Sequence, residues 1–460
     1  MNTSSVPIFQ DSNEARSILV KILIVAFVLR AVLPLAAWVT TKDKAVFHNP
    51  DTQGYVDSAM SLLRDGRFER EGMPEILRTP GYPLLLIPGL RTGNVELVTI
   101  CLQILISCFT VYLVYKITAE VFRTAKGACF GAGLYAVEPL SIMYCSYLLT
   151  ETFFAFLLAM FLYLMIRWIH TQRVLFIILA AAVLAASAYV RPISYYLPAL
   201  VTILVLVWTL LRRESVKRKL IHCCLFFVVS MSMIGLWQVR NYVLAGYSGF
   251  SAAQEVNLYG WAGAAILAAK NNIPLLSQQQ MMWESYGEQH PEHREWSRVQ
   301  VLEYQGREGA RLIRDNLGLY AKIHLRSTLL TILGPGVSSF LHLFGSKAAS
   351  LTEQAVYGSL EKTVVQRFLG LSPLILSLDV LLGAYLMAVF LLAIIGLARC
   401  INKVSVPDVV FLLACAGYVI IIVPGLGYSR FRHPAMPVVC VFAGYGLATL
   451  LERFRNKSAG

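Results

Sequence analysis

The stretch YLLTETFFAFLLAMFLYLMIRW, residues 147–168, decides the fold class of this chain. Its charged residues are Glu151 near the start and Arg167 near the end. About 20 predominantly apolar residues are needed to cross the hydrocarbon core of a bilayer as a helix. The segment 149–168 is therefore predicted to be a transmembrane helix with an acid at one mouth.

The same apolar pattern recurs along the chain of 460 residues, of which 57% are hydrophobic and 15% charged. Soluble domains contain about 25% charged residues. The composition excludes a disordered protein, a disulfide-stapled secreted domain and a nucleic-acid-binding module as accounts of the whole chain. We predict an all-α polytopic membrane protein with about ten transmembrane helices. They lie at 18–40, 96–116, 127–146, 149–168, 174–190, 193–211, 219–239, 373–398, 407–425 and 434–452.

Two further apolar segments are too weak to be predicted as spans. Segment 81–90 is too short to cross a bilayer, and 326–345 is interrupted by Gly334-Pro335-Gly336. If 326–345 crossed, the basic loops after it would change sides. We therefore expect it to be re-entrant or interfacial on the outer side.

Basic residues set the predicted orientation, because lysine and arginine gather in cytoplasmic loops. With both termini in the cytoplasm, every short inner loop is basic, and this accounts for the net charge of +13. The residues concerned are Arg123, Lys126, Arg167, Arg173, Arg212, Arg213, Lys217, Arg218, Lys219, Arg399, Lys403, Arg453, Arg455 and Lys457.

This topology divides the chain into three parts. Residues 1–240 form an N-terminal transmembrane module with a first outer loop at 41–95, residues 241–372 an outer region, and residues 373–460 the C-terminal transmembrane helices. The nine cysteines lie within or beside apolar runs, so no disulfide framework is expected.

The first outer loop carries a candidate general base. Asn49 as a cap, Pro50 as the first helical residue and Gly66 as the terminator predict an amphipathic helix in the membrane interface. Tyr55 belongs to its apolar stripe. Asp51 then lies in the first turn, where the helix dipole keeps a carboxylate ionised. It can act as a base on a hydroxyl, or it can simply support the helix.

The turn Arg78-Thr79-Pro80-Gly81-Tyr82-Pro83 follows. Its two prolines and its glycine are expected to stop a helix, and the apolar run after it to dip into the bilayer. Arg78 can hold a lipid phosphate by a forked hydrogen bond, or it can snorkel to head groups. Tyr82 is a further candidate for substrate binding.

Two acids near the fourth span receive different interpretations. Acids within or beside a span are costly and are candidates for function. Glu151 lies at the outer mouth of the span, on the same side as Asp51, and is assigned a functional role. Glu138 lies deeper, and we expect it to be a structural acid that is bonded to its neighbours.

Arginines recur at outer helix ends, where the distribution of basic residues makes them less expected. They are Arg191, Arg240, Arg430 and Arg432. A guanidinium fits phosphate oxygens with two hydrogen bonds. These four and Arg78 are predicted to converge on one outer pocket that binds a lipid phosphate. No phosphate loop and no clear metal motif is present; residues 284–293 could bind a metal, but a solvated loop is the expectation.

The quoted motifs occur in the same order in one family. The chain resembles the polytopic GT-C glycosyltransferases, in the bacterial branch that is related to protein O-mannosyltransferases and the lipid A aminoarabinose transferase. Here the first loop has Thr52 after Asp51, where many relatives have an acidic pair.

The resemblance implies a GT-C fold and an enzyme that transfers a hexose or pentose from a polyprenyl-phosphate carrier, with inversion. The acceptor is a lipid, glycan or protein at the outer side of the bacterial inner membrane. Asp51 takes the place of the base, Glu151 that of a second acid, and the arginines hold the carrier phosphate. Some relatives use a divalent metal, but no ligand for one can be identified, so the cofactor stays open.

Two other functions remain open from the sequence. One is a transporter or flippase of lipid-linked sugars, although transporters usually show two related halves. The other is a glycan polymerase or ligase that uses a lipid diphosphate donor.

Overall fold

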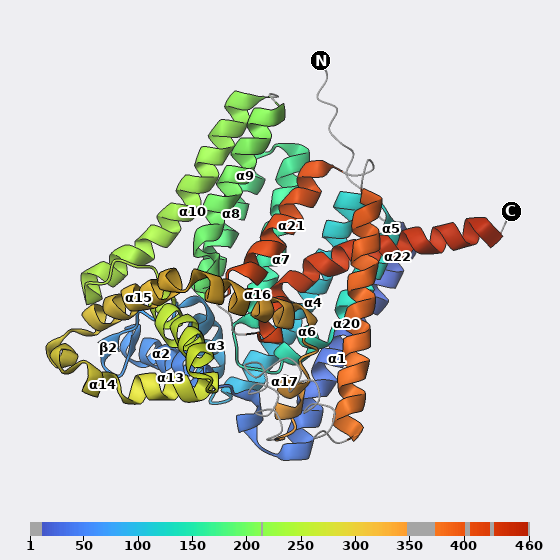
Figure 1. The fold of residues 1–460 in the computed structure, drawn as a ribbon. Helices are drawn as coiled ribbons and strands as arrows, with labels where there is room; N and C mark the ends of the chain where they lie inside the picture. Colours follow the sequence, from blue (N-terminus) through green and yellow to red (C-terminus); the bar gives the residue numbers. More distant parts are fainter. Residues whose placement is uncertain (1–11, 213–214, 347–372, 401–404, 424–426, 459–460) are drawn as a thin grey trace.

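The computed structural model describes residues 12–212, 215–346, 373–400, 405–423 and 427–458 (Figure 1). Arg213, Lys403 and the segment 347–372, on which the orientation and the division into parts partly depend, lie outside the described residues. Among the described residues the protein is a helical bundle, with a group of shorter helices beside one of its ends (Figure 1).

Within the described chain, seven helices are long and apolar enough to cross a membrane. They are α1 (Asn13–Thr41), α4 (Val95–Phe122), α7 (Glu151–Thr171), α9 (Leu197–Arg212) with its preceding turn η2 (Pro192–Tyr196), α10 (Val216–Ala245), α20 (Pro373–Cys400) and α22 (Met436–Ser458) with its preceding turn η6 (Ser429–Ala435). Two shorter apolar helices are α8 (Val174–Val190) and α21 (Val406–Ile421). The integral membrane class is confirmed, and the number of ten spans stays a prediction.

The predicted span 127–146 is wrong as a single helix, because the structure divides it into α5 (Ala125–Ala136) and α6 (Pro139–Tyr144). Pro139 has no N–H to continue the helix, and the side chain of Glu138 caps α6 by accepting from the backbone N–H of Ser141. Arg30 of α1 donates to the carbonyl of Ala136 and to the hydroxyl of Ser141, so that the broken helix end is hydrogen-bonded within the protein.

Small residues let the central helices approach each other closely. In the contact between α5 and α22, a Cβ added to Gly131 would lie 3.0 Å from the carbonyl oxygen of Cys440. Gly396 of α20 and Gly446 of α22 likewise face each other's backbone. Lipid tails are as apolar as leucine, so close packing of this kind is a main source of helix association in membranes.

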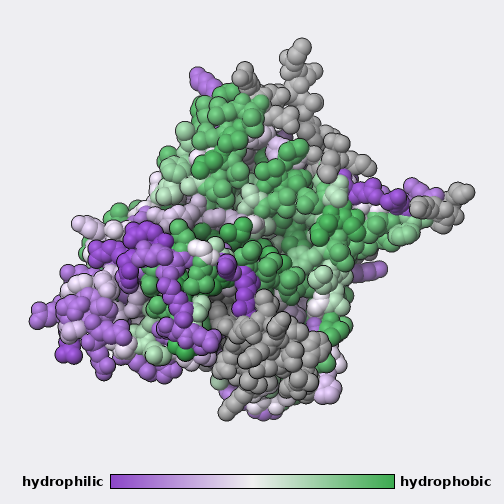
Figure 2. Space-filling model, viewed as in Figure 1, coloured by the Kyte–Doolittle hydropathy of each residue, from purple (hydrophilic) through white to green (hydrophobic). Residues whose placement is uncertain are grey.

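The hydropathy of the surface separates two regions. The surface of the long helices is largely hydrophobic, whereas hydrophilic residues gather over the short helices at the left and lower left (Figure 2). These short helices are α11 (Ala253–Asn257), η3 (Leu258–Gly263), α12 (Ala264–Asn271), α13 (Leu275–Glu284), α14 (Tyr286–Gln289), η4 (Pro291–Glu295) and α15 (Arg298–Asp315). They are followed by α16 (Leu317–Leu333) and α17 (Val337–His342), which lie nearer the centre of the view (Figure 1).

The first loop lies beside this polar group. It contains η1 (Lys44–Phe47), α2 (Thr52–Asp65), the antiparallel strands β1 (Glu69–Arg70) and β2 (Met73–Pro74), and α3 (Gly81–Arg91). The two-residue hairpin is an addition to the predicted all-α architecture. Glu71 and Gly72 both have positive φ, as its tight turn requires.

The predicted stop at Arg78–Pro83 is in fact the start of a helix, since α3 begins at Gly81 and prolines are tolerated in a first turn. A Cβ on Gly81 would lie 2.6 Å from the carbonyl oxygen of Tyr189, so glycine lets α3 pack against the end of α8. This contact brings Arg78 and Arg191 to the same end of the bundle. The other weak segment, 326–345, forms the second half of α16, a break at Gly334–Gly336, and α17.

Candidate active site

Asp51 lies at the N-cap of α2, but its side chain makes no capping hydrogen bond. The helix begins at Thr52, so the predicted start at Asn49 and Pro50 is two residues early. The backbone N–H of Thr52 donates to the carbonyl of Asn49 and forms a turn before the helix. The Asp51 carboxylate is therefore available to other groups.

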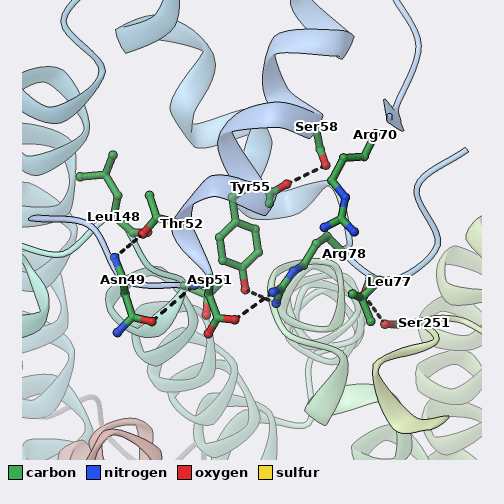
Figure 3. Close-up of polar contacts among 12 residues, drawn as sticks. Asn49, Asp51, Thr52, Tyr55, Ser58, Arg70, Leu77, Arg78, Leu148 and Ser251 are labelled. Atoms are coloured by element: carbon green, nitrogen blue, oxygen red, sulfur yellow. Dashed lines mark hydrogen bonds and ion pairs between the residues drawn. The ribbon is translucent and has the colours of Figure 1, made fainter. Parts of the chain in front are cut away.

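Both oxygens of Asp51 accept a hydrogen bond from an arginine. Nη2 of Arg78 lies 2.8 Å from Oδ1, and Nη2 of Arg430 lies 3.1 Å from Oδ2. Arg78 also donates to the hydroxyl of Tyr55, at 3.3 Å, and its guanidinium lies over the Tyr55 ring (Figure 3). The carboxylate thus joins the first loop to η6, which is 379 residues distant in sequence.

A second acid continues this arrangement. Glu151, the first residue of α7, is 2% exposed, and its Oε1 accepts from Nη1 of Arg191 at 3.0 Å. Nε of Arg430 lies 3.7 Å from the same oxygen. Arg191 and Arg430 both lie over the ring of Phe431. Arg430 therefore faces both acids.

Five side chains from five segments form one continuous series of ion pairs, which we call the ionic chain: Arg78, Asp51, Arg430, Glu151 and Arg191. Three guanidiniums and two carboxylates give it a formal charge of +1. Nε of Arg78 is buried and makes no hydrogen bond within the described part of the chain, and Nε of Arg430 meets Glu151 only at 3.7 Å, which is too long for a hydrogen bond. The site thus has one excess positive charge and N–H groups that are not fully used, which is what an anionic ligand requires.

Hydrogen bonds hold the segment that carries Asp51 against the start of α7. The hydroxyl of Thr52 accepts from the backbone N–H of Asn49 and donates to the carbonyl of Leu148 (Figure 3). The N–H of Leu148 donates in turn to the carbonyl of Phe47. Because Leu148 lies three residues before Glu151, in the bend that leads into α7, these bonds tie the segments that carry the two acids to each other.

A separate network positions Arg78. Glu75 is fully buried, and its Oε1 accepts from the backbone N–H groups of Leu77 and Arg78. The hydroxyl of Ser251 donates to the carbonyl of Leu77 (Figure 3). Arg240 donates to the carbonyl of Glu75 at 2.7 Å and to that of Phe68 at 2.6 Å. Arg240 therefore supports the loop that presents Arg78.

The predicted convergence of all five arginines is wrong for two of them. Arg240 is engaged with the first loop, and Arg432 is buried and donates to the carbonyls of Thr331, Ile332 and Gly334 at the end of α16. Tyr82 is also buried, with its hydroxyl donating to Gln103. The structure brings together Arg78, Arg191 and Arg430 with the two acids. Arg240, Arg432 and Tyr82 lie outside that group.

The sequence pattern places Tyr55 in the apolar stripe of α2 and does not predict its contact with Arg78. Tyr55 is largely buried and touches Arg78 through both its ring and its hydroxyl. Its spacing four residues after Asp51, which places the two on one helical face, was the available signal.

The electrostatics of Asp51 follow from this geometry. Burial acts to raise the pKa of Asp51, but the charges of Arg430 and Arg78, with the hydrogen bonds from both, lower it to about 2. Asp51 is therefore ionised at neutral pH. A carboxylate with so low a pKa is a weak base for as long as both arginines remain on it.

A substitution at Arg240 separates its observed role from the predicted one. We expect Arg240→Ala to lower the free energy of unfolding by about 1.5–3 kcal/mol, because charged hydrogen bonds to two carbonyls are lost. Binding of a lipid phosphate, the ligand that the sequence predicts, should weaken less than in Arg78→Ala, and Arg240→Lys should recover part of the lost stability. Thermal unfolding in detergent and carrier binding measure this, with Arg314→Ala as an exposed control. Unchanged stability with abolished carrier binding would return Arg240 to the phosphate site.

The sequence profile of the family described as dolichyl-phosphate-mannose-protein mannosyltransferase matches residues 79–237, a range that includes Glu151 and Arg191. No curated protein matches the chain.

Among solved structures, the archaeal oligosaccharyltransferase AglB from Archaeoglobus fulgidus, in complex with an inhibitory peptide and a dolichol-phosphate, matches with a TM-score of 0.55 and 13% identity over 97% of this chain. The apo form of the A. fulgidus oligosaccharyltransferase matches with a TM-score of 0.56, also at 13% identity and over 97% of this chain. In both cases this chain spans 51% of the matched chain. ArnT from Cupriavidus metallidurans bound to undecaprenyl phosphate matches with a TM-score of 0.37 and 15% identity, over 91% of this chain and 77% of its own.

At these identities the likeness to AglB concerns the fold alone. It extends over almost the whole chain, and the matching family profile lies inside the same region. The resemblance to the GT-C glycosyltransferases is thereby confirmed at the level of the fold. The protein is an integral membrane protein with the GT-C fold.

Proposed function

We propose that the protein is an inverting glycosyltransferase that moves a hexose or pentose from a polyprenyl-phosphate carrier to a hydroxyl or phosphate of a lipid, glycan or protein. The observation that carries the proposal is the ionic chain, which places two carboxylates among three arginines at one end of a membrane bundle. The dolichol-phosphate in the AglB complex supports the choice of carrier.

The charge of the site supports a carrier with a single phosphate. A sugar joined to a polyprenyl phosphate is a phosphodiester with one negative charge, which matches the formal +1 of the ionic chain. When the sugar leaves, the phosphate becomes a monoester and its negative charge grows. Three guanidiniums around it would stabilise that developing charge, and such electrostatic stabilisation is usually the largest single contribution to catalysis.

The proposed reaction is one displacement at the anomeric carbon. The acceptor oxygen forms a bond to this carbon from the face opposite the phosphate, and the bond from the carbon to the phosphate oxygen breaks. The electron pair of that bond stays with the phosphate. For a hydroxyl acceptor, the proton passes to Asp51. Glu151 orients Arg191 and Arg430 toward the phosphate.

The low pKa of Asp51 imposes a condition on this mechanism. A base works best with a pKa near the working pH, so Asp51 needs to lose its arginine partners before it accepts a proton. A bound phosphate competes for the same N–H groups of Arg78 and Arg430. We therefore infer that donor binding moves the arginines from carboxylate to phosphate and raises the basicity of Asp51 only when a donor is present.

The proposal includes a location. We place the site at the outer face of the bacterial inner membrane and both termini in the cytoplasm, as the basic loops predict. The polar short helices then lie in the outer aqueous phase, beside the site (Figures 1 and 2).

Purified protein in lipid nanodiscs tests the function. Polyprenyl-phosphate-linked hexose and pentose are supplied in turn with an extract of lipid and glycan acceptors, and free carrier phosphate is measured. We expect release with one of these donors and only in the presence of acceptor. Release only from a lipid diphosphate donor would indicate a polymerase or ligase instead. Movement of an intact donor across proteoliposomes without release would indicate a transporter.

A further inference from the structure

A second cluster of ionisable side chains lies in the polar group of short helices, between α13 and α15. The sequence favoured a solvated loop at residues 284–293. The structure instead forms two short helices there, α14 and η4, and His293 is 7% exposed. His290 joins the two helices and is followed by Pro291 in the first turn of η4.

The geometry of η4 brings two imidazoles together. Side chains three residues apart are eclipsed in a 3-10 helix. The rings of His290 and His293 accordingly lie 4.6 Å apart between centroids and are nearly parallel. Glu292 extends between them, and its Oε1 lies 3.2 Å from Nδ1 of His290 and 3.4 Å from Nε2 of His293.

These distances match the edges of a zinc coordination shell. In a tetrahedral site with ligand atoms about 2.0–2.1 Å from zinc, neighbouring ligand atoms are about 3.3 Å apart. Two of the three edges in this cluster already have that length, and all three ligand atoms lie within 4.8 Å of one another. Turning His290 and Glu292, whose side chains are 22% and 60% exposed, closes the third edge and brings both rings to face one ion.

The surroundings of His293 prepare it as a ligand. The hydroxyl of Tyr286 lies 2.9 Å from its Nδ1, so that an N–H at this position can be donated to the hydroxyl while Nε2 keeps its lone pair. The ring stacks on Trp296 and meets the edge of Tyr304 from α15. An outer partner of this kind, which fixes ring orientation and tautomer, accompanies most metal-binding histidines.

We propose that His290, Glu292 and His293 bind a divalent transition metal, with Zn²⁺ as the ion that best fits two imidazoles and one carboxylate. Water or another donor fills the fourth position. The ion would fix the junction between α14 and η4, where all three ligands lie, and so stabilise the polar helices beside the ionic chain. The same three contacts can also be made by protons alone, with N–H groups on both imidazoles facing Glu292, and the experiment must separate these two states.

The test is zinc binding by the full-length protein in detergent. Protein stripped with a chelator and desalted is titrated with ZnCl₂, and bound zinc per chain is measured after gel filtration. We expect wild-type protein to bind one zinc more than His290→Ala or Glu292→Gln. Both substitutions change partly exposed side chains, and gel filtration verifies that the variants fold. Exposed thiols such as Cys101 and Cys224 contribute equally to every protein, so the difference between proteins is the measure.

Two further variants sharpen the result. Tyr286→Phe removes the outer partner and should weaken zinc binding by about 10–100-fold. His324→Ala removes a histidine of α16 outside the cluster and should bind zinc as wild type does. Added zinc should raise the melting temperature of wild type and His324→Ala but not that of Glu292→Gln. Equal zinc stoichiometry in wild type, His290→Ala and Glu292→Gln would overturn the proposal.

Discussion

Asp51→Asn is expected to lower the turnover number by about 10²–10⁴-fold, the usual contribution of a general base. The amide keeps the shape of the side chain and one acceptor for Arg78, but it cannot take the proton of the acceptor hydroxyl. Folding should be preserved, because the side chain does not cap α2. Carrier binding should be retained or strengthened, because Arg78 and Arg430 lose a competing carboxylate.

The matched control is Asp65→Asn, which removes an exposed carboxylate at the far end of the same helix. Its turnover should equal that of wild type. If Asp51→Asn keeps more than about a tenth of wild-type turnover, the loss is smaller than a general base contributes. Glu151 and Asp57 would then be the next candidates for the base among the acids on that side.

The pH dependence of the two kinetic constants tests the exchange of arginines. In the free enzyme the pKa of Asp51 is about 2, so protonation of Asp51 should not reduce kcat/KM on acidification from neutral pH to about 4.5. In the complex with donor, the arginines are shared with the phosphate and the pKa of Asp51 should be higher. The acid limb of kcat is therefore expected at higher pH than that of kcat/KM. Coincident limbs would mean that both arginines stay on Asp51.

The free energy of unfolding should fall when Asp51 is protonated, because the pKa of Asp51 is lowered in the folded protein. A carboxylate whose pKa is lowered on folding stabilises the protein above its unfolded pKa, about 3.9 for aspartate. That contribution is lost as the pH falls from about 4 to about 2, the window set by the folded pKa of Asp51. Kinetic measurements above pH 4.5 thus report chemistry rather than unfolding at this residue.

The spans could be predicted from sequence because each depends on local composition. The stretch 149–168 became α7 with a small shift at each end, and Glu151 lies at its mouth as expected. The divided span at Glu138 and Pro139 was missed, since its average hydropathy is that of one helix. What makes the division tolerable is Arg30, which is far away in sequence and supplies the lost hydrogen bonds.

The candidate site was predictable in part for a similar reason. Charged residues at helix ends are conspicuous in an apolar chain, so Asp51, Arg78 and Arg430 were all found. Which arginines face the acids depends on tertiary contacts that composition does not encode. Arg240 and Arg432 have the same local signature as Arg430, yet backbone carbonyls of other segments take their N–H groups.

Arg430→Gln is expected to reduce kcat by about 10²–10³-fold, the usual cost of removing one donor that stabilises developing negative charge. Within the described chain, Arg430 is the residue that pairs with both Asp51 and Glu151. Its loss lowers the formal charge of the ionic chain from +1 to zero and leaves the buried Glu151 with Arg191 alone. Carrier binding should weaken together with turnover, in contrast to Asp51→Asn.

Arg430→Lys tests whether charge alone is sufficient. An ammonium group keeps the positive charge but cannot reach two carboxylates and a phosphate with a planar fork, so its activity should lie between those of wild type and Arg430→Gln. Arg453→Ala, which removes an exposed arginine from the end of α22, should leave the rate unchanged. Full activity of the lysine variant would show that the forked geometry is not used.

The double variant Asp51→Asn/Arg430→Gln asks whether the two residues act together. Residues that work as a unit in catalysis are strongly non-additive, so the double variant should lose about as much turnover as the more damaging single variant. If donor binding transfers Arg430 from Asp51 to the phosphate, each residue depends on the other for its role. Losses that simply multiply would separate them and would leave the ion pair between η6 and the first loop as a structural contact only.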